Sequence, residues 1–234
     1  MPRKNTKKSF VLDGIYHVYN RGVEKRNIFL DEADYLYFSS ILRSALKKEA
    51  PEDMIGNVLR NRIQNFSDTI TMLAYCLMPN HFHFLIKQQD EHSLDKFIKS
   101  VCTRYSMYFN RKYKRIGSLF ETVYKAILIK DDAYFLHISR YIHKNPTKLH
   151  IDLVKAHSSY AEYLGLKNTS WVNPGLILAS FSSETNSPHT SFTSYRSFVE
   201  EADETDQKTE WAIESYLLDN DEPTGSDPVR VRPS

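Results

Sequence analysis

The sequence predicts an α+β fold of the ferredoxin-like, split βαβ type, in which helices cover an antiparallel sheet and a helical extension follows at the C-terminal side. Two observations support this prediction. Strand and helix patterns alternate up to Pro146 in the order strand, helix, strand, strand, helix, strand, helix. The first six elements of that order define the split βαβ sandwich. The composition is also that of a globular domain, with 41% hydrophobic and 26% charged residues among 234.

Four stretches carry the signals of β-strands. Each is rich in β-branched, aromatic or other apolar residues, and the second and third are joined at Pro79-Asn80. A turn at this position predicts a hairpin, although Pro-Asn is a less specific turn signal than Asn-Gly. The predicted strands are residues 14–20, 69–78, 81–87 and 118–130.

The predicted helices begin at capping residues. Asp31 and Ser93 each precede apolar residues at helical spacing, and Asp131 or Asp132 precedes a third such stretch that has to end at Pro146. Residues 50–67 are polar and irregular, which predicts a loop, with or without a short helix inside it. The helices that follow Asp31 and Ser93 are predicted at 32–48 and 93–111. Short helices are also predicted at 158–164 and 174–181.

Composition divides the chain into four parts. They are a basic N-terminal arm (1–13), the main domain (14–150), a C-terminal helical extension (151–181) and an acidic, partly disordered tail (182–234). Apolar residues between Phe192 and Leu218 predict at least one docked helix within that tail, and we expect the tail to be dispensable for chemistry. No apolar run is long enough to cross a membrane, so we expect a cytoplasmic protein with reduced cysteines.

A His-Phe-His run at residues 81–83 follows the predicted turn. Side chains two apart in a strand point to the same face, so His81 and His83 should lie side by side while Phe82 faces the core. Two parallel imidazoles can hold a divalent ion. Two unrelated histidines on a half-exposed strand would show the same run, and the motif alone does not separate these interpretations.

Tyr141 and Asn145 are a second candidate pair, on the last helix of the domain. At about 3.6 residues per turn, positions four apart differ by only about 40° around the helix axis, so both side chains reach one region. The amide oxygen of Asn145 is a hard ligand of the kind that Mg²⁺ or Mn²⁺ accepts. A core tyrosine followed by a helix-terminal asparagine is the alternative interpretation.

Together the two pairs predict phosphoryl-transfer chemistry. A divalent ion, Mg²⁺ or Mn²⁺, held by the two histidines and Asn145 would polarise a scissile phosphate, and Tyr141 would attack the phosphorus to form a phosphotyrosine. The ordinary pKa of tyrosine is about 10, so the hydroxyl needs the metal or a neighbouring base. His137 and Lys148 are both candidates for that base, and we expect Tyr141 to be largely exposed.

Basic and aromatic residues interleave through the centre of the chain, while the net charge is only +2. This pattern suits a nucleic-acid backbone with unstacked bases. A solvated helix face above a core aromatic stripe would produce the same pattern. The predicted DNA-contacting residues are Arg21, Arg104, Arg111, Lys112, Lys114, Arg115 and Lys125.

Two motifs taken together identify a known family. The run Leu-Met-Pro-Asn-His-Phe-His at residues 77–83, with Tyr-Ile-x-x-Asn-Pro at 141–146, resembles the single-tyrosine HUH transposases of IS200-like type. Similarity is greatest to the REP-associated tyrosine transposase branch. Residues 16–22, 117–120 and 158–164 also resemble that branch, so the resemblance covers about residues 14–165.

The resemblance implies a role for each of four residues. His81 and His83 would bind the metal, Asn145 would complete the metal site, and Tyr141 would be the nucleophile. The family cuts single-stranded DNA next to hairpins and leaves a 5′-phosphotyrosine and a free 3′-hydroxyl. The implied partner is therefore single-stranded DNA that contains hairpins, and the implied enzyme is a metal-dependent nickase and strand transferase acting as a monomer or homodimer. The resemblance also implies a prokaryotic cell, with the protein associated with the nucleoid when it is bound to DNA.

Three other functions fit parts of the pattern. A plain binding module on the same fold, such as an RNA-recognition motif, would carry a Lys/Arg-Gly-Phe-Gly-Phe signature, and the sequence contains none. A phosphodiesterase in which water attacks would not need Tyr141. A domesticated relative that nicks hairpin DNA, or binds nucleic acid, without transposing would have the same sequence pattern. DNA target, physiological metal and oligomeric state stay open.

Overall fold

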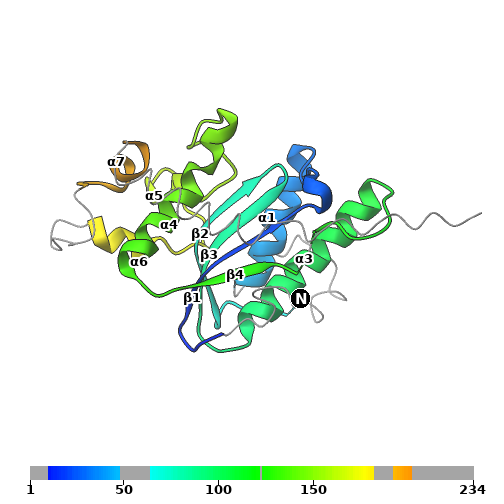
Figure 1. Cartoon of the computed structure of the whole chain (residues 1–234), viewed down its shortest axis with the longest axis horizontal. Coiled ribbons are helices and arrows are strands. Elements are labelled where there is room, and N and C mark those ends of the chain that lie inside the picture. Colours follow the sequence, from blue (N-terminus) through cyan, green and yellow to red (C-terminus); the bar gives the residue numbers. More distant parts are fainter. Residues whose placement is uncertain (1–9, 48–63, 122, 182–191, 202–234) are drawn as a thin grey trace, which may run out of the picture.

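The computed structural model describes residues 10–47, 64–121, 123–181 and 192–201. Its centre is a four-stranded antiparallel sheet in the order β2-β3-β1-β4, with helices on both sides (Figure 1). This is the strand order of the ferredoxin-like sandwich, so the predicted fold class is confirmed. The strands are β1 (Ile15–Arg21), β2 (Ile70–Met78), β3 (His81–Gln88) and β4 (Lys125–Ile129).

The predicted hairpin sets the register at the centre of the sheet. β2 turns into β3 at Pro79-Asn80, so that Met78 lies opposite His81. β3 in turn pairs with β1, which places Arg21 opposite His81 and Tyr19 opposite His83. The end of β1 and the start of β3 therefore meet at one edge of the molecule, beside the turn.

One face of the sheet is covered by two long helices. α1 (Glu32–Leu46) and α3 (Ser93–Lys112) pack on each other and on the sheet. Phe82 and Phe84 of β3 are fully buried there among aromatic and aliphatic side chains. Burial of this apolar surface is the main source of stability on this face.

The opposite face is covered by α4 and the C-terminal elements, which form a second core cluster. α4 packs on β2, β3, β4 and the last described helix, α7. α7 is the docked helix predicted within the tail, and its Ser194 cap accepts a hydrogen bond from the Ser197 amide. The elements are α4 (Asp132–Lys144), η2 (Asn145–Leu149), α5 (Tyr160–Tyr163), α6 (Gly175–Leu178), η3 (Ala179–Phe181) and α7 (Tyr195–Glu200).

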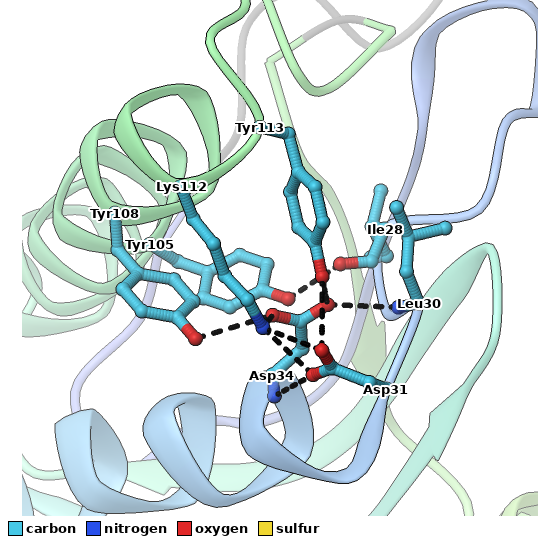
Figure 2. A network of polar contacts seen from close by, with 8 residues as sticks. All are labelled: Ile28, Leu30, Asp31, Asp34, Tyr105, Tyr108, Lys112 and Tyr113. Atoms are coloured by element: carbon cyan, nitrogen blue, oxygen red, sulfur yellow. Dashed lines mark hydrogen bonds and ion pairs between the residues drawn. The ribbon is translucent and has the colours of Figure 1, made fainter.

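A polar network joins the start of α1 to the end of α3 (Figure 2). The Lys112 ammonium lies 2.7 Å from a carboxylate oxygen of Asp34 and 2.7 Å from one of Asp31. Asp34 also accepts hydrogen bonds from the Leu30 amide and from the Tyr113 hydroxyl, each at 2.8 Å. A fully buried carboxylate needs such partners, so the network fixes how the two helices meet.

Two sequence predictions need correction. Ser93 is the first residue of α3 rather than its cap, because the Asp90 carboxylate accepts hydrogen bonds from the amides of His92 and Ser93. The predicted strand at 118–130 shortens to β4, since most of its first half forms an irregular segment that buries Leu119 and Phe120 in the α1 and α3 face. That segment meets the end of β1 through a bridge of Phe120 to Gly22 and a hydrogen bond from the Glu121 amide to the Arg21 carbonyl at 2.9 Å.

The capping residues Asp31 and Asp131 are confirmed, as each carboxylate accepts the amide three residues on. Most of the predicted loop 50–67, most of the arm 1–13 and the tail beyond 201 lie outside the described residues. No helix of the described parts is both long and apolar enough to cross a membrane.

Candidate active site

His81 and His83 project from β3 toward the α4 face, as the alternation predicts. Their ring centroids are 4.9 Å apart, so the two side chains are neighbours. The rings are nearly perpendicular, at 87°, rather than parallel as expected. The difference arises because each ring is hydrogen-bonded to a different partner.

The turn before β3 orients His81. Its Nδ1 lies 2.6 Å from the side-chain oxygen of Asn80, whose amide nitrogen donates to the Lys25 carbonyl at 3.2 Å. The Gly22 amide donates to the Asn80 carbonyl at 2.9 Å, and a Cβ on this glycine would collide with the Arg26 carbonyl oxygen. The half-buried imidazole of His81 is thus held by a loop that packs closely on the turn.

His17 of β1 holds the second histidine. Its Nε2 lies 2.9 Å from Nδ1 of His83, and the two rings stack with centroids 5.1 Å apart. Burial, followed by the neighbouring charges of His81 and His17, lowers the pKa of His83 well below its usual range. Burial likewise lowers the pKa of His17 to about 3. Both imidazoles are therefore neutral at physiological pH, the form that can bind a metal ion.

Tyr141 reaches the two histidines from α4. Its ring centroid is 5.5 Å from that of His83 and 6.3 Å from that of His17, with edge-to-face geometry in both pairs. The side chain is only 7% exposed and belongs to the apolar cluster of this face. The expectation of a largely exposed tyrosine is wrong, because the C-terminal elements pack around α4 and cover this part of it.

Asn145 ends α4 and begins η2, one turn beyond Tyr141. It is buried, and its amide nitrogen donates to the Tyr141 carbonyl at 2.8 Å. This bond engages the nitrogen end of the amide, so the oxygen is the end of the side chain that could bind a metal ion. The described residues contain no cluster of three or more His, Cys, Asp or Glu side chains that could hold a metal, so a site here depends on an amide as the third ligand.

The two candidate bases near Tyr141 lie in different surroundings. The Lys148 ammonium is 5.1 Å from the centre of the Tyr141 ring. The His137 ring instead packs against Phe198 of α7, with centroids 5.7 Å apart. Of the two, Lys148 is therefore the one that the structure places next to the tyrosine.

The predicted DNA-contacting residues divide into two groups. Arg21 lies opposite His81 in the sheet, and the Lys125 ammonium is 5.6 Å from the Tyr19 ring beside His83, so both are near the site. Lys112 is held by Asp31 and Asp34 in the network of Figure 2. Away from the site, on α3 and the turn that follows it, lie Arg104, Arg111, Lys112, Lys114 and Arg115.

Sequence reasoning assigned no role to His17. The signal that could have found it is the alternation of β1, which puts His17 and Tyr19 on one face of a buried strand. The partner could not be identified from spacing, because the contact with His83 depends on the pairing of β1 with β3. In the sequence, His17 stands out only as part of the family-like run at residues 16–22.

Comparison with known proteins agrees with this geometry. The family model of the IS200-like transposases matches residues 32–145, which include both histidines, Tyr141 and Asn145. Residues 32–145 of the chain are therefore similar to the IS200-like transposases. No curated protein matches the chain.

Two solved structures are among those similar to this chain. One is a REP-associated tyrosine transposase bound to a REP hairpin, with 12% sequence identity and a TM-score of 0.48 over 72% of this chain and 96% of that one. The other is a protein of Deinococcus radiodurans R1 assigned as a transposase, with 18% identity and a TM-score of 0.35 over 60% of this chain and 97% of that one.

Proposed function

We propose that this protein cuts and rejoins single-stranded DNA through a covalent bond between Tyr141 and a 5′-phosphate. The observation that carries the proposal is the convergence of β3 and α4. His81, His83 and Tyr141 come from elements far apart in sequence, and the ring of Tyr141 lies within 5.5 Å of that of His83. Two histidines beside a tyrosine are parts that such a reaction requires.

The donor set fits a divalent cation of the hard or borderline class, Mg²⁺ or Mn²⁺. Nδ1 of each histidine is occupied, by Asn80 for His81 and by His17 for His83, which assigns Nε2 of both rings to the ion. The oxygen of Asn145 would be the third protein ligand. When bound, the ion would polarise the scissile phosphate and offset the charge that grows on its oxygens.

Tyr141 supplies the nucleophile. Its oxygen attacks the phosphorus, the new oxygen–phosphorus bond forms and the bond to the 3′ oxygen breaks. The proton lost by the tyrosine is matched by the proton gained by the leaving 3′ oxygen, so the products are a 5′-phosphotyrosine and a 3′-hydroxyl. Attack of a 3′-hydroxyl on the phosphotyrosine reverses these bond changes and rejoins DNA without an external energy source.

Lys148 promotes the attack in this proposal. A cation 5.1 Å from the Tyr141 ring favours the phenolate over the neutral phenol. Arg21 and Lys125, near the histidines, would bind the phosphates on either side of the cut. The preference for strands beside a hairpin rests on the family-like motifs of the sequence, as does the assignment to the REP-associated branch.

The test is incubation with a labelled hairpin oligonucleotide that carries a single-stranded flank. We expect a covalent protein–DNA adduct on a denaturing gel with Mn²⁺ or Mg²⁺, its loss with a chelator and its return when metal is added back. His81→Ala should need far more metal for the same yield. Cleaved DNA without any adduct would replace the proposal by hydrolysis with water as the nucleophile.

A further inference from the structure

A pocket lies beside β2, the edge strand of the sheet, on the side away from β3. Its volume is about 450 Å³, and its two walls are one face of α1 and the segment from Val154 to Trp171. The segment is anchored along the strand, because the Leu77 amide donates to the His157 carbonyl at 2.8 Å and the Ser159 amide to the Tyr75 carbonyl at 3.0 Å. The pocket is therefore a built feature of the fold, within the size range of small-ligand sites.

Aromatic rings from different elements line this pocket. Tyr35 of α1 stacks on His157, with ring centroids 3.8 Å apart and planes within 11°. Tyr75 of β2 packs against Trp171, with centroids 5.2 Å apart. The His157 side chain is 35% exposed, so this ring is in part accessible to solvent. Tyr75 and Trp171 are buried, so the partly exposed Tyr35–His157 pair is the aromatic surface on which a planar ligand would stack.

The charges at the pocket are mainly positive. Arg43, Lys155 and Lys167 line it together with a single carboxylate, Glu32. Glu32 is paired with His157 at 3.1 Å. Lys167 is paired with Glu162 at 3.5 Å. Within the described chain, by contrast, no carboxylate forms an ion pair with Arg43 or Lys155. Two exposed cations are thus available for an anionic ligand.

We propose that this pocket binds one unpaired nucleotide of the single-stranded DNA, with its base on the Tyr35–His157 stack and its phosphate at Arg43 and Lys155. The inference rests on the proposed function and extends it to a second binding site, outside the catalytic residues. The site lies next to β2, two strands away from His17. It would hold the strand in place while the reaction takes place on the α4 face.

The chemistry of the lining selects this ligand over others. A metal ion would need several carboxylate or imidazole ligands, and the one carboxylate here is already bound to the one histidine. A free phosphate would use the cations but not the ring faces. A nucleotide uses both, because each base offers a planar π-face and each phosphate a negative charge.

Trp171 provides a direct readout. The sequence contains two tryptophans, Trp171 and Trp211, so in the full-length Trp211→Phe chain the fluorescence reports on the pocket alone. Titration with a tetranucleotide of deoxythymidine or deoxyadenosine should change this fluorescence. An abasic tetramer of the same charge and inorganic phosphate should produce little change, because neither stacks.

Two variants of that chain test the assignment of charges and rings. Arg43→Gln with Lys155→Gln should weaken tetranucleotide binding about tenfold, and should make the slope of log affinity against log salt less steep by about 0.7, the value for one lost phosphate contact on a single strand. His157→Ala should also weaken binding about tenfold, through the loss of stacking. The matched control is Lys96→Gln with Lys130→Gln, which removes two exposed cations from α3 and the end of β4 and should leave the affinity unchanged.

The outcomes separate the pocket from the proposed chemistry. Adduct formation at saturating DNA should be unchanged in the Arg43→Gln, Lys155→Gln chain, with a higher DNA concentration needed for half-maximal yield. Two results would overturn the pocket and leave the proposed function intact. One is an unchanged half-maximal DNA concentration and an unchanged salt slope in this variant. The other is Trp171 fluorescence that does not change while labelled DNA binds and forms the adduct. Complete absence of DNA binding by the unaltered chain would overturn both.

Discussion

The two faces of the sheet are built from different kinds of side chains. Under α1 and α3 the interior is aromatic and aliphatic, and Phe38 stands among other rings, with centroids 5.6 Å from Phe82 and 4.8 Å from Tyr105. Under α4 the interior also contains hydrogen-bonded polar groups, which include the buried pairs of His17 with His83 and of His143 with Tyr195. One strand, β3, contributes phenylalanines to the first face and histidines to the second.

This difference separates stability from chemistry. Polar groups are costly to bury unless they are hydrogen-bonded, whereas aromatic rings stabilise by burial alone. A face that retains histidines, an amide and a tyrosine in contact with one another is where a reaction can be located. Substitutions of the candidate site residues on the α4 face should therefore change the reaction, whereas substitutions under α1 and α3 should change only the unfolding free energy.

The largest expected effect is the loss of the nucleophile. Tyr141→Phe should reduce the covalent adduct at least about 1,000-fold, because no oxygen remains to attack phosphorus. The ring that packs in the cluster is retained, so the unfolding free energy should change by about 1 kcal/mol or less. Adduct yield on a denaturing gel and urea unfolding measure the two quantities.

The matched control is Tyr163→Phe, on the same face. It removes a buried hydroxyl that donates to the Leu73 carbonyl at 2.9 Å, and it should lower stability while the adduct still forms. If both variants lost the adduct to the same extent, the loss would reflect damage to the face rather than the chemistry of Tyr141.

The second prediction concerns the apolar face. Phe38→Ala should destabilise the protein by about 3–5 kcal/mol, because the side chain is fully buried and its removal leaves a cavity. The adduct formed per folded molecule should not change. Phe38→Leu is a milder version for the case in which the alanine variant does not fold. An adduct rate that falls with Phe38→Leu at full folding would show that the two faces are coupled.

Local sequence signals predicted the order of elements and much of the site. Asp31, Asp131 and the Pro79-Asn80 turn act within a few residues, so they can be recognised without knowledge of the rest of the fold. The alternation in 81–83 likewise placed the histidines on one face. Contacts between distant segments could not be predicted in this way.

The missed features all depend on tertiary packing. Lys112 looks like one more cation of a basic block until α1 brings Asp31 and Asp34 against it. Tyr141 looks like an exposed helix residue until the C-terminal helices cover it. The first half of the predicted strand at 118–130 has residues suited to a strand, but this segment packs against the core under α1 and α3 instead of joining the sheet.

The third prediction uses pH to probe the apolar face. Burial raises the pKa of the Asp34 carboxyl, but hydrogen bonds from Lys112, the Leu30 amide and Tyr113 outweigh it, so the pKa lies below its ordinary value. A lowered folded-state pKa means that the contribution to stability is complete above about pH 4, the ordinary value, and is lost as the pH falls through the folded value.

The urea midpoint of the unaltered protein should therefore fall between pH 5 and pH 2, values chosen to lie on either side of about pH 4. In the Asp34→Asn variant the urea midpoint should be lower at pH 5 and should fall less between pH 5 and pH 2. Tyr113→Phe, which removes one donor to Asp34 at 2.8 Å, should give a smaller change in the same direction. Equal pH dependence in all three proteins would show that the network of Figure 2 does not stabilise the charged carboxylate.

The smallest effect is expected from shortening the chain after Glu201. Every residue assigned to the reaction precedes that point, and the acidic residues beyond it would repel a phosphate backbone. The shortened chain should cleave hairpin DNA as fast as the full chain or faster, with an unchanged thermal midpoint.

A chain that ends after Phe181 makes the informative comparison, because it also lacks α7. That chain loses the Tyr195 hydroxyl, which lies 2.7 Å from His143 and 3.1 Å from Ser139. It also loses the other buried side chains of α7.

The original expectation that everything after about residue 182 is dispensable therefore becomes two separate expectations. Loss of α7 leaves the buried imidazole of His143 without one of its partners, two residues from Tyr141 on the same helix, so the thermal midpoint should fall by several degrees. The adduct rate should fall with it, because α4 positions the nucleophile. If the chain ending after Phe181 matched the chain ending after Glu201 in both midpoint and adduct rate, α7 would have no part in holding the polar face together, and the contrast between the faces would rest on the histidine site alone.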